Sequence, residues 1–341
     1  MSAHARRLLV VGCGKRVLEA ALPALQRAGP GLALRSVLAR KARTIEAAGV
    51  SYEVAPLADA REAELADIDL VYLAVGKNAV PDVLARLLEL GLGRAELLIE
   101  TPVVRFRHFR HVARLREFRR VSVAEDCAML PWFDALAAAA SLVGRVKRVE
   151  LDRSAYAYHA VATARELTGG RRVRSARRIA LAEGAFERRL FFDSAEAWVR
   201  EPRDYPTGRT SIVGERATVR DHDAGDGALQ LTAIVERGLV RGFRLGDAET
   251  RLDDDEAALT AGDAPDASIT ARQEAMKRVG FLRIWRRLAA GEPAHPLALG
   301  LEDMVVDYAL ERAGRYVSTP FTRPDAVLGR GLFGLLSRLG G

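Results

Sequence analysis

The strongest constraint on the fold lies in the first third of the chain, where short apolar runs alternate with segments of helical spacing. The apolar runs predict strands at 7–11, 32–38, 52–54, 69–75 and 96–100. The helical spacing predicts helices at 18–26, 43–48 and 80–90. Continuous apolar strands that alternate with helices are typical of a parallel sheet covered on both faces. We therefore expect an N-terminal α/β domain with the doubly wound parallel sheet of a Rossmann fold.

The pattern changes after residue 120. We expect strands at 121–124 and 145–152, and helices at 133–143 and 160–167. Several strand candidates between 173 and 252 are separated by Gly and Asp turns rather than by helices, which indicates a mainly antiparallel sheet. An acidic loop is expected at 253–266, followed by helices at about 269–290 and 301–312. The predicted organisation is a domain at 1–120, an α+β domain at 121–320 and a tail at 321–341.

Length and composition agree with two globular domains. The chain has 341 residues, 49% of them hydrophobic and 28% charged, which excludes a disordered or disulfide-stapled chain. Cys13 and Cys127 are its two cysteines, as expected for a reducing compartment. Apolar runs are too short for a membrane span, and the opening residues do not form a signal peptide. We expect a cytoplasmic protein.

The net charge of +7 favours an anionic partner: nucleic acid, acidic lipid or a phosphorylated cofactor. The segment 104–120 mixes arginines with apolar residues, a pattern that can follow a nucleic-acid backbone or form the solvated face of a helix. We favour the helix and expect no nucleic-acid binding. The apolar tail at 325–339 could lie on a membrane surface, although packing on the protein itself is preferred.

A phosphate-binding loop is the most informative local motif. In VVGCGKRVLEA, Gly12 permits the tight turn and Gly14 lets the backbone approach a pyrophosphate at the helix start. Val17 replaces the third glycine of the usual fingerprint. The alternative is a glycine turn that binds no ligand.

The end of the second strand distinguishes between the two dinucleotides. NAD binding requires an acidic residue there for the ribose hydroxyl, whereas this chain has Ala-Arg-Lys-Ala-Arg at 39–43 and no acid before Glu46. Arg40, assisted by Lys41 or Arg43, suits a 2′-phosphate. The alternative is a solvated basic turn. We expect NADP(H).

With these residues, the chain resembles the Gfo/Idh/MocA family of oxidoreductases, in particular the NADP-dependent, glucose-fructose oxidoreductase-like type. The resemblance rests on VGCGKRVLEAALPAL, DIDLVYLAV, LLIETPV, VAEDCAMLP, VGRVKRVELD and AYAYHAVATARELTG. It implies a large open sheet in the second domain, through which the chain would form a homo-oligomer. It also implies cofactor contacts from Gly12, Gly14, Lys15, Arg16, Arg40, Lys41, Val75, Glu100 and Pro102.

Two positions depart from the family pattern. Thr101 stands where the family has the lysine of Glu-Lys-Pro, and Ala155 stands where an aspartate usually precedes the substrate-binding histidine, here His159. The replacements that we consider are Lys77 for the lysine, and Tyr156 and Tyr158, Glu125 or Asp126 as proton donors. Tyr156 and Tyr158 would share one face of a strand. The alternative is that His159 is a structural histidine and that the tyrosines only pack.

The predicted function is hydride transfer between NADP(H) and a carbonyl, hydroxyl or imine carbon of a small sugar-like or secondary-metabolite substrate in the interdomain cleft. His159 with Tyr156 or Tyr158 would act as acid and base, and Thr101 and Lys77 would position the nicotinamide or the substrate. We expect no metal site, because His108 and His111 lie among arginines. Cys127 is expected to be a buried small residue rather than a nucleophile, because no paired base is evident. The alternative is a dinucleotide-binding sensor or partner subunit without turnover.

Overall fold

The computed structural model describes residues 5–170, 172–223, 225–262 and 267–319, which form two compact units. Unit 1 contains the described residues up to Glu125 together with Phe281–Glu302, and unit 2 contains Asp126–Gly280 and Asp303–Ser318. The predicted boundary at residue 120 lies close to the first division. The prediction places 281–302 in a continuous second domain at 121–320, whereas the structure groups these residues with unit 1. The expected tail at 321–341 lies outside the described residues.

Unit 1 is built on a sheet of eight strands among its described residues, in the order β17-β7-β6-β5-β1-β2-β4-β3. Its strands are β1 (Arg6–Val11), β2 (Leu32–Ala39), β3 (Arg43–Ala47), β4 (Val50–Pro56), β5 (Leu70–Leu73), β6 (Glu96–Glu100), β7 (Arg120–Ala124) and β17 (His295–Pro296). The neighbouring strands β4, β2, β1, β5, β6 and β7 pair in parallel. The edge strands β3 and β17 pair antiparallel with their neighbours. The predicted doubly wound sheet is confirmed.

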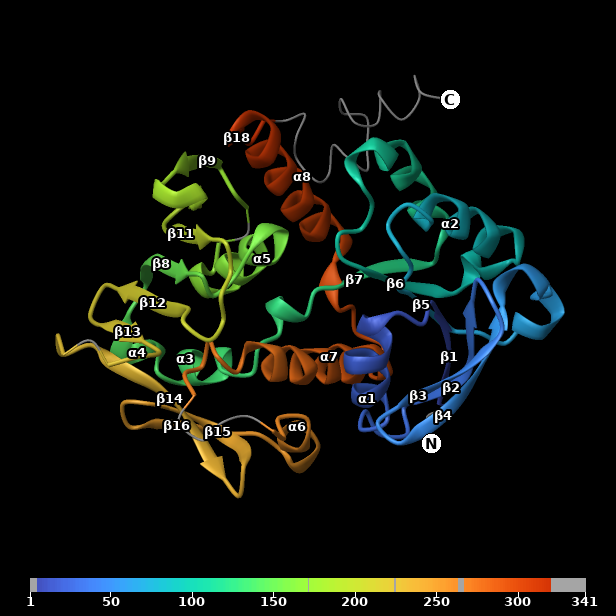
Figure 1. Cartoon of the computed structure of the whole chain (residues 1–341), viewed down its shortest axis with the longest axis horizontal. Helices are drawn as coiled ribbons and strands as arrows, with labels where there is room; N and C mark the ends of the chain where they lie inside the picture. Colours follow the sequence, from blue (N-terminus) through green and yellow to red (C-terminus); the bar gives the residue numbers. More distant parts are fainter. Residues whose placement is uncertain (1–4, 171, 224, 263–266, 320–341) are drawn as a thin grey trace. The chain divides into compact units, whose positions relative to one another are not determined.

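Helices cover the parallel strands of unit 1, with α2 (Val80–Glu89) on one side and α1 (Leu22–Leu25) on the other (Figure 1). The helix after β1 begins with a π-helical turn, η1 (Val17–Ala21), that leads into α1. As expected, α2 stops at Gly91, whose φ of +69° is the left-handed conformation that glycine adopts easily. The 3-10 turns of this unit are η2 (Leu57–Asp59), η3 (Glu62–Leu65), η4 (Leu92–Arg94) and η5 (Phe106–Glu117).

One prediction for unit 1 is wrong in the type of element, and another is made more specific. The helix predicted at 43–48 is the strand β3, in which buried Ile45 and Ala47 alternate with exposed neighbours. The helix expected within 104–120 is present as the 3-10 helix η5, which buries Phe109, Val112 and Leu115. A spacing of three residues matches the three residues per turn of a 3-10 helix.

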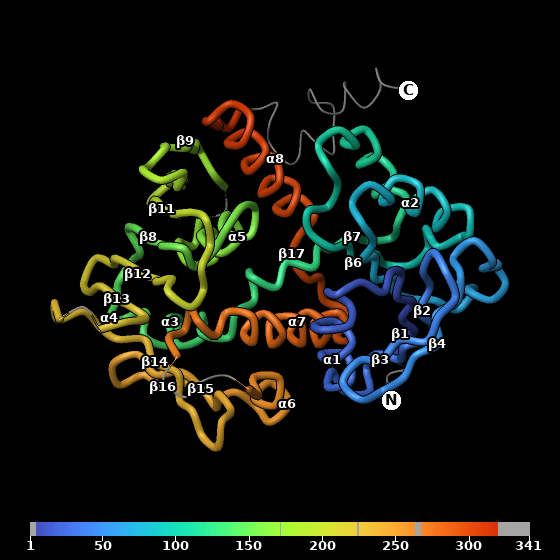
Figure 2. The backbone as a smooth tube through the Cα atoms, viewed as in Figure 1, coloured from blue at the N-terminus to red at the C-terminus, as the bar shows by residue number. Residues whose placement is uncertain are grey.

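Unit 2 contains a sheet of ten strands within the described chain, in the order β16-β15-β14-β13-β12-β8-β11-β10-β9-β18. The strands are β8 (Val146–Asp152), β9 (Ser175–Ala180), β10 (Phe186–Phe191), β11 (Glu196–Glu201), β12 (Arg209–Gly214), β13 (Thr218–Arg220), β14 (Leu229–Glu236), β15 (Leu239–Leu245), β16 (Ala248–Arg251) and β18 (Arg315–Val317). Figure 2 shows β14, β15 and β16 side by side. Most pairs are antiparallel, with parallel pairing at β8–β11 and β13–β14, so the expected mainly antiparallel sheet is confirmed.

The helices outside unit 1 refine the prediction. They are α3 (Phe133–Ala138), α4 (Ala140–Val143), α5 (Ala157–Thr168), α6 (Asp254–Ala258), and the 3-10 turns η6 (Asp126–Ala128) and η7 (Ala182–Gly184). The single helix predicted at 133–143 is broken into α3 and α4. The acidic stretch predicted as a loop begins with α6, because the Asp253 side chain accepts a hydrogen bond from the Glu256 backbone and caps the helix. The long helices α7 (Gln273–Ala289) and α8 (Leu297–Ala313) each contribute to both units.

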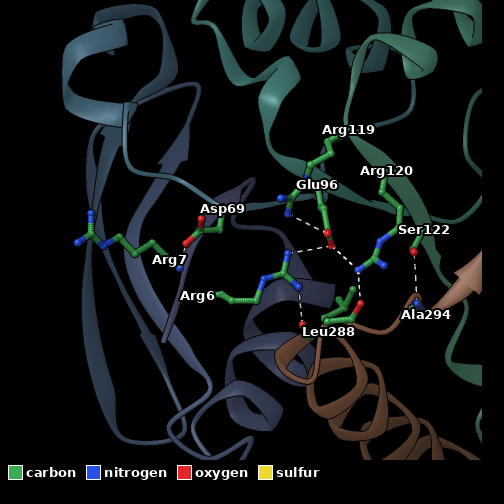
Figure 3. Close-up of polar contacts among 10 residues, drawn as sticks. Arg6, Arg7, Asp69, Glu96, Arg119, Arg120, Ser122, Leu288 and Ala294 are labelled. Atoms are coloured by element: carbon green, nitrogen blue, oxygen red, sulfur yellow. Dashed lines mark hydrogen bonds and ion pairs between the residues drawn. The ribbon is translucent and has the colours of Figure 1, made fainter. Parts of the chain in front are cut away.

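An ion cluster ties together the amino-terminal ends of the parallel strands in unit 1 (Figure 3). The carboxylate of Glu96, at the start of β6, lies 2.8 Å from Arg6, 2.9 Å from Arg119 and 2.7 Å from Arg120. Arg6 also donates to the backbone oxygen of Leu288 in α7. Burial alone would raise the pKa of Glu96, but the hydrogen bonds from Arg6 and Arg120 hold it below its ordinary value. Glu96 is therefore ionised and fully paired.

No helix within the described ranges is long and apolar enough to span a bilayer.

Candidate functional site

A cavity of about 740 Å³ opens at the carboxyl ends of the parallel strands in unit 1. In the sheet, β2 lies on one side of β1 and β5 lies on the other, so the strand order reverses at β1. Ligands of open α/β sheets bind at such points. The lining residues are Val11, Gly12, Cys13, Gly14, Ala39, Arg40, Leu57, Ala58, Ala74, Val75, Gly76, Ala79, Asp82, Val83 and Arg86.

The two glycines of the loop after β1 have different tasks. Gly12 has a φ of +115°, and a Cβ at this position would lie 2.1 Å from the backbone oxygen of Ala74. Only glycine can therefore make this turn beside β5. A Cβ at Gly14 would meet nothing within 4 Å, although Gly14 lines the cavity. The missing side chain of Gly14 thus leaves room at the start of the helix for a ligand group to approach the backbone.

Arginines surround this loop. Arg40, after β2, is exposed and lines the cavity, as does Arg86 of α2, which the sequence did not single out. The guanidinium of Arg43 donates to the backbone oxygen of Cys13 at 2.9 Å, so Arg43 holds the loop in place. Lys15 and Lys41 are not among the lining residues. The side chain of Lys15 is 83% exposed and lies 3.6 Å from Glu19.

The end of β6 is organised around Glu100. Its carboxylate accepts a hydrogen bond of 2.9 Å from Tyr72 and one of 3.2 Å from Nε of Arg16. The Tyr72 ring packs edge-on against Phe281 and Trp285, both of which lie on α7. Arg16 is therefore engaged with Glu100, whereas we expected it to contact the cofactor. Glu100, Thr101 and Pro102 do not line the cavity.

Lys77, after β5, has a pKa well below the ordinary value of a lysine. Its Nζ donates to the backbone oxygen of Glu100 at 2.8 Å. Burial lowers the pKa of Lys77 to about 8, with the Glu100 carboxylate opposing the shift and Arg16 adding to it. An amine that titrates near neutral pH can both give and take a proton. Lys77 thus lies one hydrogen bond from the end of β6, where Thr101 follows Glu100.

In unit 2, the structure brings Tyr156, Tyr158 and His159 together at the start of α5. The prediction that the two tyrosines share one face of a strand is wrong, because Tyr156 caps the helix and Tyr158 lies within it. Ring centroids lie 5.1 Å apart for Tyr156 and His159, and 4.3 Å apart for Tyr158 and His159. His159 is buried and the tyrosines are half-buried.

The start of α5 is fixed by a buried ion network. Ala157 has a φ of +50°, and its backbone N–H donates to the carboxylate of Glu201 at 3.1 Å. Glu201 lies 2.6 Å from Arg188, which also contacts Asp307 at 2.6 Å. Burial raises the pKa of Glu201, and the charge of Arg188 opposes this. This network therefore holds the unusual backbone from which Tyr156 and Tyr158 project.

Sequence reasoning missed two cationic side chains beside Tyr156 and a tyrosine that one of them contacts. The guanidinium of Arg203 lies 4.1 Å from the centroid of the Tyr156 ring, and Nζ of Lys277 lies 5.7 Å from it. Nζ of Lys277 also donates to the hydroxyl of Tyr205 at 2.7 Å. These residues lie far from Tyr156 in the sequence and in no motif. The only local signal for these residues is that Lys277 occupies a position on the buried face of α7.

Asp126, Cys127 and His159 have the donor types of a transition-metal site. All three are buried, and their ligand atoms lie within 4.8 Å of one another. The ammonium of Lys277 interacts electrostatically with both Asp126 and Cys127. A buried cation thus lies beside this cluster, and we assign no metal to it.

Comparisons with known proteins support the fold. No protein-family model matches the chain, and no curated protein matches it in sequence. Among solved structures, it is similar to an aldose-aldose oxidoreductase from Caulobacter crescentus (TM-score 0.58, 11% identity, 92% of this chain and 100% of that one). It is also similar to the WlbA dehydrogenase from Bordetella pertussis in complex with NADH and UDP-GlcNAcA (0.56, 16%, 94% and 99%).

An oxidoreductase from Thermotoga maritima matches to a similar degree, with a TM-score of 0.57, 15% identity and coverage of 92% of this chain and 98% of that one. At these identities the similarity establishes the fold alone. The chain therefore has the two-sheet fold of these solved oxidoreductases.

Proposed function

We propose that the protein is an NADP(H)-dependent oxidoreductase that acts on a small carbonyl, hydroxyl or imine substrate. The observation that carries the proposal is the cavity at the carboxyl ends of β1, β2 and β5, lined by the glycine loop and Arg40. Bound there, the nicotinamide would supply or accept the hydride. The solved relatives support this class of reaction, since one of them holds NADH.

The cavity fits a dinucleotide in three respects. Gly12 and Gly14 expose backbone at the start of the helix, where a pyrophosphate would lie. Leu57, Ala58, Ala79 and Val83 provide apolar surface for an adenine. Among the lining residues, the strand end after β2 offers Arg40 and no carboxylate. This favours a 2′-phosphate over a free ribose hydroxyl.

Each unit holds candidate groups for the chemistry. In unit 1, Lys77 has a pKa of about 8, near the value that suits proton transfer at neutral pH, and with Thr101 it would orient the ring or substrate. In unit 2, the cluster of Tyr156, Tyr158 and His159 would bind and orient the substrate oxygen. The residues of this chain thus supply orientation and protons, and the cofactor supplies the hydride.

A dinucleotide-binding protein without turnover is the second candidate. It is favoured by Thr101 and Ala155, which provide no acid at the two positions where the resembled family has a lysine and an aspartate. An oxidation and reduction assay on sugar, keto and imine panels separates the two. NADPH binding with no turnover on any panel supports the second candidate.

The test of the cofactor site is Arg40→Asp. We expect NADPH affinity, followed by nicotinamide fluorescence, to fall about tenfold or more, because a charge-assisted contact to the 2′-phosphate is lost. NADH affinity should change far less. Arg35→Asp is the matched control, since Arg35 is an exposed arginine of β2 that does not line the cavity. Equal NADPH affinity in Arg40→Asp and wild type rules out this cofactor site.

A further inference from the structure

A buried lysine meets a tyrosine hydroxyl in unit 2. Lys277, on α7, is 5% exposed, and its Nζ donates to Oη of Tyr205 at 2.7 Å. A carboxylate oxygen of Glu274 lies 3.4 Å from the same Nζ. Burial alone would lower the pKa of Lys277, but neighbouring acidic groups, Cys127 and Asp126 among them, raise it above its ordinary value. Lys277 is therefore a cation at neutral pH.

Close packing of α7 places this cation. A Cβ on Gly280 would lie 2.6 Å from the backbone oxygen of Asp126, so the helix can approach that segment only with glycine here. A glycine inside a helix costs about 1 kcal/mol relative to alanine, and the contact explains its presence. Lys277 precedes Gly280 by three residues and lies on the same helix face. The close approach thus turns Lys277 toward Asp126.

The hydroxyl of Tyr205 is surrounded by hydrogen-bond donors. An ammonium has no acceptor, so the oxygen of Tyr205 must accept the hydrogen bond from Lys277. The guanidinium of Arg203, which also has only donors, lies 5.4 Å from the centroid of the Tyr205 ring. Neither neighbour can receive the phenolic proton. That proton is therefore left for a third atom.

The surroundings of Tyr205 keep its phenol protonated. Burial raises the pKa of Tyr205 to about 12, and the charge of Lys277 opposes the shift. The phenol keeps its proton at neutral pH. If the proton leaves, the resulting tyrosinate has an ammonium at hydrogen-bond distance to stabilise it. The ammonium of Lys277 thus lowers the cost of removing the phenolic proton.

Tyr205 shares both cations with a predicted site residue. Nζ of Lys277 lies 4.8 Å from the centroid of the Tyr205 ring and 5.7 Å from that of Tyr156. Arg203 lies 5.4 Å from the Tyr205 ring and 4.1 Å from the Tyr156 ring. Tyr156 in turn lies beside His159, with 5.1 Å between ring centroids. Tyr205 and Lys277 thus belong to the cluster at the start of α5.

We propose that Tyr205 is the proton donor to the substrate oxygen and that Lys277 is the residue that positions and supports it. The inference rests on the proposed oxidoreductase function. As a substrate carbonyl carbon receives a hydride, its π-electron pair moves to the oxygen, which takes the phenolic proton of Tyr205. The tyrosinate is held by Lys277 and regains a proton from water. In the oxidative direction the same tyrosinate removes the hydroxyl proton.

A spectroscopic test needs no turnover. A difluorotyrosine, whose phenol titrates at lower pH than tyrosine, is placed at position 205 of the full chain and followed by ¹⁹F NMR. In Lys277→Met, we expect the titration midpoint to rise by at least about one pH unit, because the adjacent cation is gone. Lys277→Arg should restore most of the shift. The same label at Tyr52, which accepts from Gln26 in unit 1, is the control. An unchanged midpoint at position 205 overturns the pairing.

Kinetics test the role in the reaction. Tyr205→Phe should lower kcat about 100-fold or more and leave KM and NADPH affinity close to wild type. Tyr52→Phe makes the same change away from the cluster and should keep full activity. Full kcat in Tyr205→Phe overturns the proposal. Wild-type protein that binds NADPH but turns over no substrate contradicts the proposed function instead, and the fluorine titration still decides whether Lys277 controls Tyr205.

Discussion

Two buried glutamates mark the two ends of strand β6, and they have opposite surroundings. Glu96 and Glu100 are each 7% exposed and are separated by three apolar residues. Glu96 is paired with three arginines within 2.9 Å (Figure 3). Glu100 has a phenol and one arginine as partners, and its backbone oxygen holds the ammonium of Lys77. The amino ends of the sheet are thus saturated with ion pairs, while the carboxyl ends adjoin a cavity.

The difference shows how one sheet separates stability from function. At Glu96, the arginines lower the pKa, so this carboxylate stabilises the folded state. At Lys77, burial lowers the pKa to about 8, so the charged lysine costs stability at neutral pH. Groups held in an unfavourable charge state are characteristic of functional sites. Substitutions at the two ends should therefore change stability in opposite directions.

The largest effect on stability is expected for Glu96→Gln. The free energy of unfolding should fall by about 2–3 kcal/mol, because the three arginines lose their shared anion. This is less than for a fully buried pair, because Arg119 and Arg120 are 57% and 32% exposed and regain water. Denaturant titration measures the loss, with Glu215→Gln as the control, a half-exposed glutamate between Arg145 and Lys147.

The pH dependence of that loss follows from the lowered pKa of Glu96. The stabilisation is complete above the ordinary glutamate pKa of about 4.3 and disappears as the pH falls through the lower pKa of the folded state. The gap between wild type and Glu96→Gln should therefore close in acid. A gap that persists unchanged at low pH excludes an electrostatic origin.

Lys77→Met should have the opposite sign. We expect a gain of about 1–2 kcal/mol at neutral pH, reduced from the full effect of the pKa shift because the side chain is only half-buried. Between pH 8 and 10.5 the unfolded chain binds more protons than the folded one, so wild-type stability rises with pH and the gain shrinks. Lys41→Met, at an exposed position, should change stability little. A Lys77→Met variant less stable than wild type contradicts the conclusion that the charge of Lys77 costs stability.

The smallest effect concerns the pH profile of turnover in Glu100→Gln. The Glu100 carboxylate raises the pKa of Lys77 against the larger effect of burial, so its removal should lower that pKa further. The alkaline limb of kcat/KM should then move to lower pH by a fraction of a pH unit. Glu96→Gln provides the contrast at the other end of the strand, and its alkaline limb should stay where it is in wild type.

The sequence predicts the structure best where a single local requirement determines the residue type. The buried strands of unit 1 are continuous apolar runs, and Gly12 is required by its own backbone and the nearby Ala74 oxygen. In contrast, the spacing of Phe109, Val112 and Leu115 fits both an α-helix and a 3-10 helix in part, so the sequence predicts a helix there but not its type.

The contacts that the sequence could not reveal join distant segments. Arg43 was expected at a phosphate, but it holds the backbone of Cys13 because β3 is a strand rather than a helix. Lys277 and Tyr205 meet only through the packing of α7 against Asp126. Neither residue lies in a motif, so only the folded structure places them together.

The separation of the two ends of the sheet is tested most directly by titrating NADPH into Glu96→Gln and Arg40→Asp under the same conditions, beside their denaturation curves. We expect Glu96→Gln to bind NADPH within about twofold of wild type despite its lower stability, and Arg40→Asp to bind at least about tenfold more weakly with stability unchanged. Equal NADPH affinity for Arg40→Asp and wild type, or a tenfold loss in Glu96→Gln while it remains folded, would contradict this division.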